Sequence, residues 1–335
     1  MPEQQLKIAV LGSGSWGTAL AILLSRNGAE ISLWGHLESE IEALIADREN
    51  KTYIPGIPFP DGITPTTDMA TAVKGADEVL VVVPSHAFRQ VMHNLALLLD
   101  SDTSVSWATK GLEPQSGKLL HEVAREELGE RPIAVISGPS FAKEVAKGLP
   151  TAVTVASSSA AHAERLAEYL HSECFRAYTS DDIIGLEVGG AAKNLMAIAA
   201  GIADGLGFGA NTRAALITRG LAEIMRLGHA LGAKPETFMG LGGLGDLTLT
   251  CTDNQSRNRR MGLALARGLS VEEARAEIGQ EVEGVMTARE VHNRALELGI
   301  DMPLSEQTYL VLYEGLDPKT AVHNLMVRRQ KPETD

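Results

Sequence analysis

Short apolar runs alternate with amphipathic stretches through the first half of the chain. Six runs have the length and composition of strands, at Lys7–Leu11, Ile31–Trp34, Val79–Val83, Ser104–Ala108, Ile133–Ser137 and Thr151–Ala156. Helical patterns lie between several of them, at Ile41–Asp47, Ala87–Leu99 and Leu119–Leu128. This alternation predicts right-handed crossovers and a parallel sheet that is covered on both faces. Val79–Val83 is apolar throughout, as expected for a strand buried on both sides.

The pattern changes past about Gly185, where the strand signals fade and helical periods take over. The long helical stretches are Leu186–Leu206, Thr212–Leu231, Val271–Ala276, Thr287–Leu298 and Ser305–Tyr313. We therefore predict a doubly wound, mostly parallel α/β domain over residues 1–184 and an all-helical domain over residues 185–335. A chain of 335 residues is long enough for two cores. Arg48–Thr67, with four prolines and two glycines, is predicted as a long loop.

The first apolar run ends in a glycine-rich turn. Gly12, Gly14 and Gly17 have the GxGxxG spacing, and a helical stretch, Thr18–Ser25, follows directly. Strand, turn and helix in this order form the context of a dinucleotide-binding Rossmann unit. The first glycine permits the turn, the second lets the backbone approach a pyrophosphate, and the third lets the helix pack closely on the strand. The alternative is a turn with a structural role only.

Composition narrows the function. The 30 basic and 43 acidic side chains give a net charge of −13, which argues against a protein that follows a nucleic-acid backbone. Cys174 and Cys251, far apart in sequence, indicate neither a metal site nor a disulfide framework, and fit a reducing compartment. The N-terminal residues lack the layout of a signal peptide, and polar residues interrupt the most apolar stretch, Val188–Phe208. We expect a cytoplasmic protein without membrane insertion.

The second predicted strand bears on the choice of cofactor. A carboxylate at its tip normally holds the adenosine ribose and selects NAD. Here the tip reads Gly35-His36, without Asp or Glu. The sequence therefore admits NADP, to whose 2′-phosphate His36 offers a hydrogen bond or partial positive charge. The alternative is that His36 is a surface loop residue. We predict that NADPH binds at least as tightly as NADH.

Polar loops follow three later strands of the predicted sheet. They contain His86, Lys110 and the segment Gly138-Pro139-Ser140. Ligands of open α/β sheets lie beyond the carboxyl ends of the strands, so these loops are expected near the cofactor. Gly138–Ser140 offers backbone N–H groups and a hydroxyl to an anionic substrate. For Lys110 the alternative is a solvated loop charge.

The helical half contains a lysine among small residues. The segment Gly189–Leu195 places Lys193 and Asn194 in an otherwise apolar helix. Two adjacent glycines inside a helix call for a reason such as close approach of a ligand or another backbone. Partial desolvation lowers the pKa of an ammonium, which would suit it for proton transfer near neutral pH. The alternative is a lysine that extends its charge to solvent at an interface.

A second glycine-rich segment, Gly240–Thr248, surrounds Asp246, and a basic helix start follows it. Ser256 has the position of an N-cap before Arg257, Asn258 and two further arginines. Helix N–H groups, a hydroxyl, an amide and a guanidinium together form a phosphate site. The alternative is a solvated basic helix.

Taken in order, these residues resemble the bacterial-type NAD(P)-dependent glycerol-3-phosphate dehydrogenases along almost the whole chain. The matching segments are Gly12–Gly17, Lys110-Gly111, Ser137–Ser140, Ala192–Asn194, Gly242–Leu247 and Ser256–Asn258. The resemblance implies interconversion of sn-glycerol 3-phosphate and dihydroxyacetone phosphate for glycerophospholipid synthesis. It also implies a helical domain like that of 6-phosphogluconate dehydrogenases, and a homodimer.

The resemblance also implies residue roles. Lys193 is expected as the catalytic proton acceptor, with Lys110 and Asn194 orienting or polarising the reacting oxygen, and no metal is expected. The residues expected to contact the sugar phosphate, besides Lys193, are Lys110, Gly138, Ser140, Asp246, Ser256, Arg257 and Asn258. Those expected to contact NADPH or NADH are Gly12, Gly14, Ser15, Trp16, Gly17, His36, Lys110, Ala142, Arg257, Glu281 and Glu283. Glu281 stands where relatives often have an apolar residue.

Two other functions fit parts of the pattern. A ketopantoate or β-hydroxyacid reductase has the same two-domain plan, but Ser256-Arg257-Asn258 favours a phosphate over a carboxylate. A regulatory protein that senses NAD(P)H without turnover would not need Lys193 on a glycine-lined helix.

Overall fold

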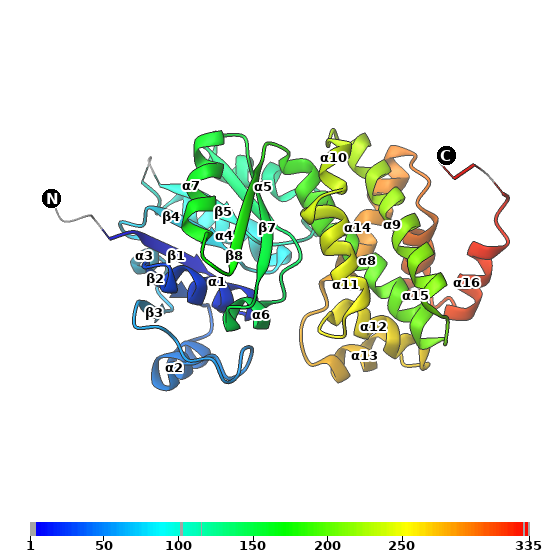
Figure 1. Cartoon of the computed structure of the whole chain (residues 1–335), viewed down its shortest axis with the longest axis horizontal. Coiled ribbons are helices and arrows are strands. Elements are labelled where there is room, and N and C mark those ends of the chain that lie inside the picture. The colour runs from blue at the N-terminus through cyan, green and yellow to red at the C-terminus, as the bar shows by residue number, and fades with distance from the viewer. Residues whose placement is uncertain (1–4, 101–102, 115, 331, 334–335) are drawn as a thin grey trace. The chain divides into compact units, whose positions relative to one another are not determined.

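The computed structural model describes residues 5–100, 103–114, 116–330 and 332–333. The chain divides into two compact units. The first comprises the residues up to Glu113 together with Lys118–Glu187, and the second comprises Pro114–Gly117 and the residues from Val188 onward. Helix α8 (Ile183–Gly205) begins in the first unit and continues into the second. Figure 1 shows strands in the first unit and helices alone in the second.

The first unit is built on one sheet whose strand order is β3-β2-β1-β4-β5-β6-β7-β8. Its strands are β1 (Lys7–Leu11), β2 (Glu30–Trp34), β3 (Ile63–Thr66), β4 (Glu78–Val81), β5 (Ser104–Trp107), β6 (Ile133–Ser137), β7 (Thr151–Ser157) and β8 (Phe175–Ser180). Its helices are α1 (Ser15–Arg26), α2 (Glu38–Asp47), α3 (Met69–Val73), α4 (Ser85–Ala96), α5 (Leu120–Leu128), α6 (Ala142–Lys147) and α7 (Ala160–Leu170), besides the start of α8. Order and composition confirm the predicted Rossmann-type α/β fold.

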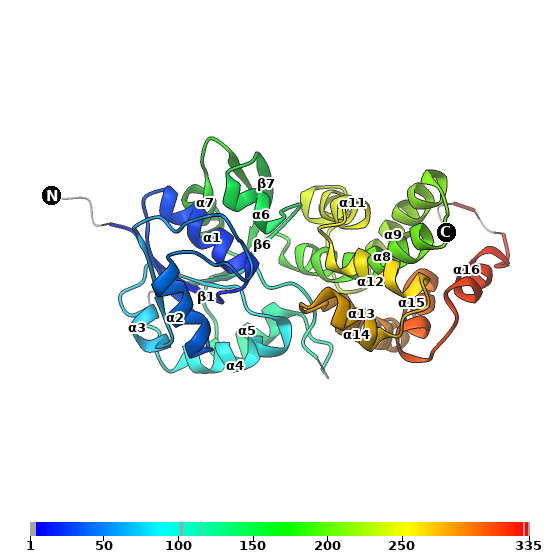
Figure 2. The same cartoon turned by 90° about the horizontal axis from the view of Figure 1, so that it is seen from below.

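Strand β1 supplies both layers of the core. Ile8 and Val10 belong to one cluster of buried apolar side chains, and Ala9 and Leu11 belong to the other. Successive side chains of a strand point to opposite faces, so this division means that both faces of the sheet are covered. In Figure 2, α1 and α7 lie on one side of β1, and α4 and α5 lie on the other.

The edges of the sheet differ from the prediction. The segment predicted as a long loop, Arg48–Thr67, contains edge strand β3, and Pro65 within it concealed the strand pattern because proline fits only edge strands. Strand β8, at the other edge, was not predicted either.

One strand pair departs from the fully parallel arrangement that the alternation implied. β7 runs antiparallel to β6, while every other neighbouring pair is parallel. The helix between them, α6, has only six residues, about 9 Å at 1.5 Å per residue. It is too short to return the chain along a five-residue strand, so β7 itself runs back.

The second unit consists of helices. After α8 they are α9 (Ala210–Ala230), α10 (Pro235–Phe238), α11 (Asp246–Thr252), α12 (Arg257–Ala266), α13 (Val271–Ile278), α14 (Glu283–Leu298), α15 (Pro303–Tyr313) and α16 (Pro318–Met326). A π-helical turn, η1 (Leu241–Gly245), leads directly into α11. The predicted all-helical character of this half is confirmed.

Helix α8 is buried on nearly all sides. It is the one helix of the described residues that is long and apolar enough to cross a membrane, and 89% of its apolar window is buried inside the protein. That burial is typical of a core helix. Gly201 of α8 and Gly262 of α12 lie so close to the opposite backbone that a Cβ on either would overlap a carbonyl oxygen. Two helices can approach this closely only where neither has a side chain.

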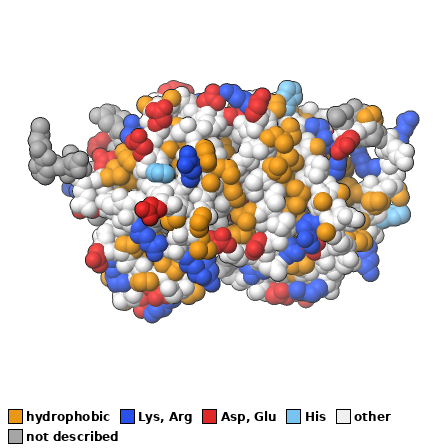
Figure 3. Space-filling view, in the orientation of Figure 1, with side chains coloured by type: hydrophobic (Ala, Val, Ile, Leu, Met, Phe, Trp, Pro, Cys, Tyr) orange, Lys and Arg blue, Asp and Glu red, His pale blue; other side chains and the backbone are white. Residues whose placement is uncertain are grey.

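The surface matches the acidic composition. On the face shown in Figure 3, Lys and Arg side chains are interspersed with Asp and Glu. Nucleic-acid binding would need the basic side chains to gather in a patch or stripe. Neither unit shows such a stripe on that face.

Candidate functional site: a glycine turn and a buried lysine

The glycine turn follows β1, and each of its three glycines has a different environment. Gly12 has a φ of 128°, and a Cβ there would lie 2.5 Å from the carbonyl oxygen of Val82. Its N–H donates to the carbonyl oxygen of Trp34 over 2.9 Å, which ties the turn to β2. A Cβ on Gly17 would overlap the carbonyl oxygen of Gly12. These two glycines are required by the protein's own packing.

Gly14 is different, because a Cβ there would meet nothing within 4 Å. Its φ of −69° is open to any residue, so the fold itself does not call for glycine. Gly14 is also the N-cap of α1, and it has no side chain that could accept from the N–H groups of the first turn. Ser15 and Trp16 are the first two residues of this turn. Open space in front of a helix N-terminus with uncapped N–H groups fits the pyrophosphate of a dinucleotide.

Five neighbouring parallel strands, in the order β2-β1-β4-β5-β6, bring the other predicted cofactor and substrate loops to this edge of the sheet. Leu11 of β1 is in register with Trp34 of β2 and with Val81 of β4, so these strands end level. The predicted residues beyond the strand ends of the first unit are His36 after β2, Lys110 after β5, and Gly138, Ser140 and Ala142 after β6. His36 is exposed, and Ala142 begins α6.

Gly138 connects two of these loops. Its carbonyl oxygen accepts from Lys110 Nζ over 3.4 Å and from Ser140 Oγ over 3.1 Å. Its φ is 149°, and a Cβ there would lie 3.0 Å from Cα of Val153. The structure therefore brings an ammonium and a hydroxyl together at the end of β6, around a position that only glycine fits.

In the second unit, Lys193 is buried in α8 with 6% of its surface exposed. Its ammonium donates to Oδ1 of Asp246 and, over 3.0 Å, to Oγ1 of Thr250. The Thr250 hydroxyl donates to the carbonyl oxygen of Asp246 over 2.6 Å, which leaves its oxygen to accept from the lysine. A carboxylate in contact favours the charged ammonium. The structure thus contradicts the alternative of a lysine extended to solvent.

Close backbone packing holds the acid beside the lysine. A Cβ on Gly189 of α8 would lie 2.5 Å from the carbonyl oxygen of Gly242 in η1, whose chain leads into α11 with Asp246 and Thr250. This is the close approach of another backbone that the glycine pair in the sequence predicted.

Asn194 follows Lys193 and faces α12. Its Oδ1 accepts from Nδ2 of Asn258 over 2.9 Å, and Oδ1 of Asn258 accepts from the backbone N–H of Gly284 over 2.9 Å. Nδ2 of Asn194 is buried and has no hydrogen-bond partner among the described residues. Buried polar groups are nearly always paired, so an unpaired donor calls for an explanation such as a bound ligand.

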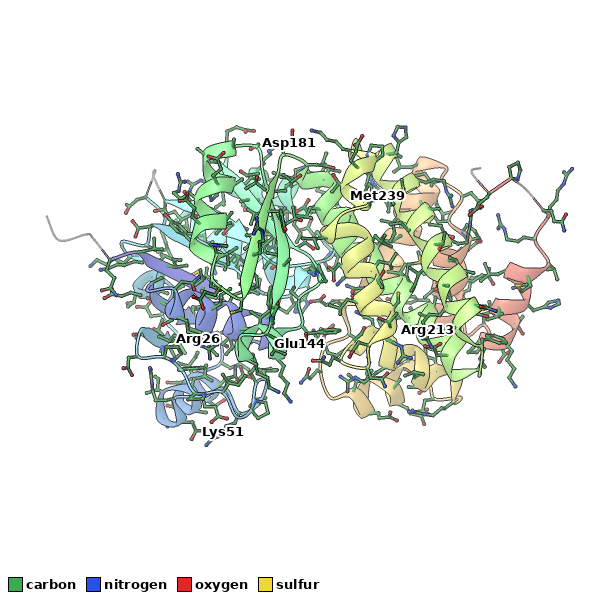
Figure 4. All side chains as sticks on the ribbon, in the orientation of Figure 1. Arg26, Lys51, Glu144, Asp181, Arg213 and Met239 are labelled. Atoms are coloured by element: carbon green, nitrogen blue, oxygen red, sulfur yellow. The ribbon has the colours of Figure 1, made fainter. Side chains whose placement is uncertain are left out.

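The basic start of α12 divides into an inner and an outer part. Ser256 caps the helix by accepting from the N–H of Arg259 over 3.2 Å. Arg259 is turned inward and contacts Asp204 over 2.6 Å, and Arg213 of α9, labelled in Figure 4, contacts the same carboxylate over 2.8 Å. Arg257 is only half-buried and forms no ion pair with any residue that the structure describes. The ion pair with Asp204 therefore removes Arg259 from the predicted cluster, whereas Arg257 stays available to an anion.

The two predicted glutamates lie at the start of α14. Glu283 is the first residue of this helix and is half-buried, whereas Glu281 precedes it and is exposed. The structure gives no interaction between either of these glutamates and Lys193.

Two polar groups were missed by the sequence interpretation. Thr250 lies four residues after Asp246, a spacing that places both on one face of a helix and could have drawn attention to it. Glu187 accepts from Trp107 Nε1 over 3.2 Å and from the backbone N–H of His121 over 3.0 Å. Burial raises the pKa of Glu187, and the contact with His121 opposes this shift. No local sequence signal predicted that pairing.

The fold and these two sites define a class of protein. A Rossmann-type unit with a dinucleotide turn, followed by a helical unit with a buried lysine held by a carboxylate, is the plan of two-domain nicotinamide-dependent dehydrogenases. Among the described residues, no group of three or more His, Cys, Asp or Glu side chains is arranged to hold a metal ion.

Comparison with known proteins identifies the family. Residues 7–163 match the N-terminal part of the NAD-dependent glycerol-3-phosphate dehydrogenase family, and residues 182–323 match its C-terminal part. The chain is 57% identical over 330 residues to glycerol-3-phosphate dehydrogenase [NAD(P)+] of Methylococcus capsulatus, covering 98% of each chain. It is 58% identical to the protein of that name from Thioalkalivibrio sulfidiphilus, covering 98% of this chain and 99% of the relative. The chain belongs to the NAD-dependent glycerol-3-phosphate dehydrogenase family.

Solved structures support the same family assignment. The crystal structure of glycerol-3-phosphate dehydrogenase from Coxiella burnetii has a TM-score of 0.94 and 49% identity, covering 97% of this chain and 99% of that one. A ketopantoate reductase from Ralstonia eutropha has a TM-score of 0.59 at 18% identity, covering 95% of this chain and all of its own. The second likeness shows a shared fold alone.

Proposed function

We propose that this chain is an NAD(P)-dependent sn-glycerol-3-phosphate dehydrogenase that interconverts dihydroxyacetone phosphate and sn-glycerol 3-phosphate for glycerophospholipid synthesis. The observation that carries the proposal is the buried ammonium of Lys193, held by Asp246 and Thr250 on a helix packed through glycine. Reduction of a ketone needs a proton donor at the ketone oxygen, and an ammonium kept charged by a carboxylate is suited to that task.

The cofactor is assigned to the glycine turn. Gly12, Gly14 and Gly17 would shape it, and the first-turn N–H groups of Ser15 and Trp16 would meet the pyrophosphate. Further contacts are assigned to His36, Lys110, Ala142, Arg257, Glu281 and Glu283. When bound, the reduced nicotinamide supplies the hydride that goes to C2 of dihydroxyacetone phosphate.

The substrate phosphate is assigned to the start of α12. Ser256 caps this helix, the half-buried guanidinium of Arg257 has no carboxylate partner in the described chain, and the backbone N–H of Asn258 lies in the first turn. Helix N–H groups and an available guanidinium are a suitable pair for phosphate. Further substrate contacts are assigned to Lys110, Gly138, Ser140, Lys193 and Asp246.

In the reductive direction Lys193 Nζ gives a proton to the C2 oxygen, and in the oxidative direction it accepts the hydroxyl proton. Asp246 and Thr250 orient the amine, since both accept from Nζ. Asn194 donates a hydrogen bond to this oxygen as negative charge develops on it. Lys110 keeps its assignment as a residue that orients or polarises the substrate.

The direct test mixes protein, NADPH and dihydroxyacetone phosphate and follows absorbance at 340 nm. Turnover is expected with dihydroxyacetone phosphate and not with ketopantoate. The Lys193→Ala variant should lose at least about 10²-fold in kcat, the lower range for general acid–base groups. Lys319→Ala, which removes an exposed lysine of α16, is the matched control and should keep wild-type kcat. Most of the activity surviving in Lys193→Ala would refute the assignment.

A separate variant tests the phosphate site. Arg257→Ala should mainly raise KM for dihydroxyacetone phosphate, whereas Arg267→Ala, at an exposed arginine paired with Glu277, should not. An unchanged KM in Arg257→Ala would place the phosphate elsewhere.

Cofactor choice, assembly and location follow from the same proposal. Titration with both cofactors should show NADPH binding at least as tightly as NADH, because no carboxylate stands at the tip of β2. A strong preference for NADH would remove His36 from its role. We expect a homodimer in the cytoplasm without membrane insertion, which light scattering and fractionation would test.

A further inference from the structure

The side-chain amide of Asn258 has its orientation fixed by a group that cannot change roles. The backbone N–H of Gly284 donates over 2.9 Å to this amide, and a backbone N–H is always a donor. The receiving atom is therefore the oxygen of Asn258, and its NH2 group must face the other way. There it donates over 2.9 Å to Oδ1 of Asn194.

This orientation passes to Asn194. Because Oδ1 of Asn194 receives a hydrogen bond, its Nδ2 is turned away from Asn258. Nδ2 is the buried donor that has no partner among the described residues. The direction of the chain Gly284 to Asn258 to Asn194 thus determines that Asn194 presents a donor rather than an acceptor.

Packing keeps the three residues in place. Asn194 is 3% exposed and Asn258 is 9% exposed. A Cβ on Gly284 would lie 2.5 Å from Oδ1 of Asn258 and 3.1 Å from the carbonyl oxygen of Asn194. The reversed amide at Asn258 would set its NH2 group against the N–H of Gly284, two donors without an acceptor between them.

We propose that Asn258 is a positioning residue that holds Nδ2 of Asn194 as a hydrogen-bond donor to the reacting oxygen of the substrate. This inference rests on the proposed function, in which Asn194 lies next to the proton-donating Lys193. A donor stabilises negative charge that develops on a carbonyl oxygen during reduction, whereas an acceptor in the same place would repel it. The side chain of Asn258 acts through Asn194, and only its backbone N–H is assigned to the phosphate.

The rival explanation is that Asn258 only ties α12 to α14. A structural tie would affect stability, and any loss of activity on removing it would not depend on which end of the Asn194 amide faces the substrate. The two explanations differ when one hydrogen-bond donor is replaced by an acceptor of the same shape.

Asn258→Asp makes this replacement. A carboxylate still accepts from Gly284 but has no proton for Oδ1 of Asn194, so the Asn194 amide turns and its oxygen faces the substrate. We expect kcat to fall by about 10²–10³-fold, as on removal of one oxyanion donor, with little change in NADPH affinity. Asn324→Asp is the matched control and should keep wild-type kcat, because the Nδ2 group of Asn324 on α16 likewise donates a hydrogen bond of 2.9 Å to a side-chain amide oxygen, that of Gln307 on α15.

A pH profile separates positioning from a structural tie. Protonation of the new carboxyl restores an O–H donor toward Asn194 and with it the original orientation. The ratio of wild-type kcat to Asn258→Asp kcat should therefore shrink as the pH is lowered. A ratio that stays constant with pH, or a kcat within threefold of wild type, would overturn the proposal.

Two further measurements keep the result decisive. If Asn258→Asp does not fold, Asn258→Ser carries the test: its side chain is too short to bridge, so Asn194 adopts both orientations and kcat falls severalfold without recovery at low pH. Wild-type kcat in that variant overturns the proposal.

Spectra of 15N-labelled asparagine amides report the orientation of the Asn194 amide without any need for catalysis. A wild-type protein that is inactive toward dihydroxyacetone phosphate would therefore refute the proposed function, while the orientation of Asn194 could still be measured.

Discussion

Gly189→Ala tests whether the close packing of α8 on η1 places Asp246 beside Lys193, the proposed proton donor. The added Cβ would lie 2.5 Å from the carbonyl oxygen of Gly242, whereas ordinary contact begins at 3.4 Å, so the two backbones must separate by about 0.9 Å. The atoms in the way are backbone atoms and cannot rotate aside. Asp246 and Thr250 follow η1 and would move away from Lys193 with it.

The expected effects are modest in stability and large in rate. Overpacking costs about 1–3 kcal/mol, and the helix gains about 1 kcal/mol from replacing glycine with alanine, so unfolding should become easier by about 0–2 kcal/mol. A misplacement of about 1 Å at a catalytic group costs on the order of 10²-fold in rate. We therefore expect kcat for dihydroxyacetone phosphate to fall by about 10²-fold while most of the protein stays folded.

The assay compares kcat, by absorbance at 340 nm, with the melting temperature by circular dichroism. Gly220→Ala is the matched control: it is also a buried helix glycine of the second unit, but the added Cβ meets the flexible side chain of Met196, with Sδ at 2.8 Å. The control should keep kcat within about twofold, since a methionine side chain adapts readily. If Gly189→Ala matches Gly220→Ala in kcat, the packing does not position the acid.

Three further predictions concern other sites. Gly14→Ala should leave the melting temperature nearly unchanged, because the added Cβ meets nothing within 4 Å. It should weaken NADPH binding by at least about tenfold in a fluorescence titration. An affinity equal to that of the wild type would place the pyrophosphate elsewhere. Burial raises the pKa of Glu187. Between the ordinary pKa of a glutamate and this raised pKa, the folded state binds more protons than the unfolded state. The free energy of unfolding therefore falls as the pH rises through that range. Urea titrations from pH 5 to pH 8 should show that the free energy of unfolding falls less steeply with pH in Glu187→Gln than in the wild type. Equal slopes in the two proteins would contradict the raised pKa of Glu187. Burial raises the pKa of Cys251 to about 12, so iodoacetamide at pH 8 should label the half-buried Cys174 in the folded protein and spare Cys251, as checked by mass spectrometry.

Most of the fold could be predicted from the sequence because its central strands are regular. β1 and β6 have the predicted bounds, and α8 begins three residues and ends one residue before the predicted helix Leu186–Leu206. The edges could not be predicted in the same way. β3 contains Pro65, which suits an edge strand but masks the pattern, and the direction of β7 depends on the length of α6.

The sequence could propose the candidate site as a set of residues but not as a set of contacts. Glycine spacing identified the turn, and a lysine in an apolar helix identified Lys193, because each is a departure from a local pattern. The pairing of Lys193 with Asp246 joins positions 53 residues apart, and no local pattern encodes it. The same is true of Arg259, whose inward turn toward Asp204 removes it from the basic cluster that the sequence indicated.

Glycine has two distinct roles in this chain, and the structure separates them. Gly17, Gly189 and Gly284 are each closed in by atoms of the protein itself, so any larger residue must move a backbone or a hydrogen-bonded amide. Gly14 alone among the fingerprint glycines has open space before it. At Gly189 and Gly284 glycine sets the distance between polar groups, and at Gly284 it also sets the direction of a hydrogen-bond chain, because a backbone N–H cannot accept. The chemistry that we propose for Lys193 and Asn194 therefore depends on residues that have no side chain of their own.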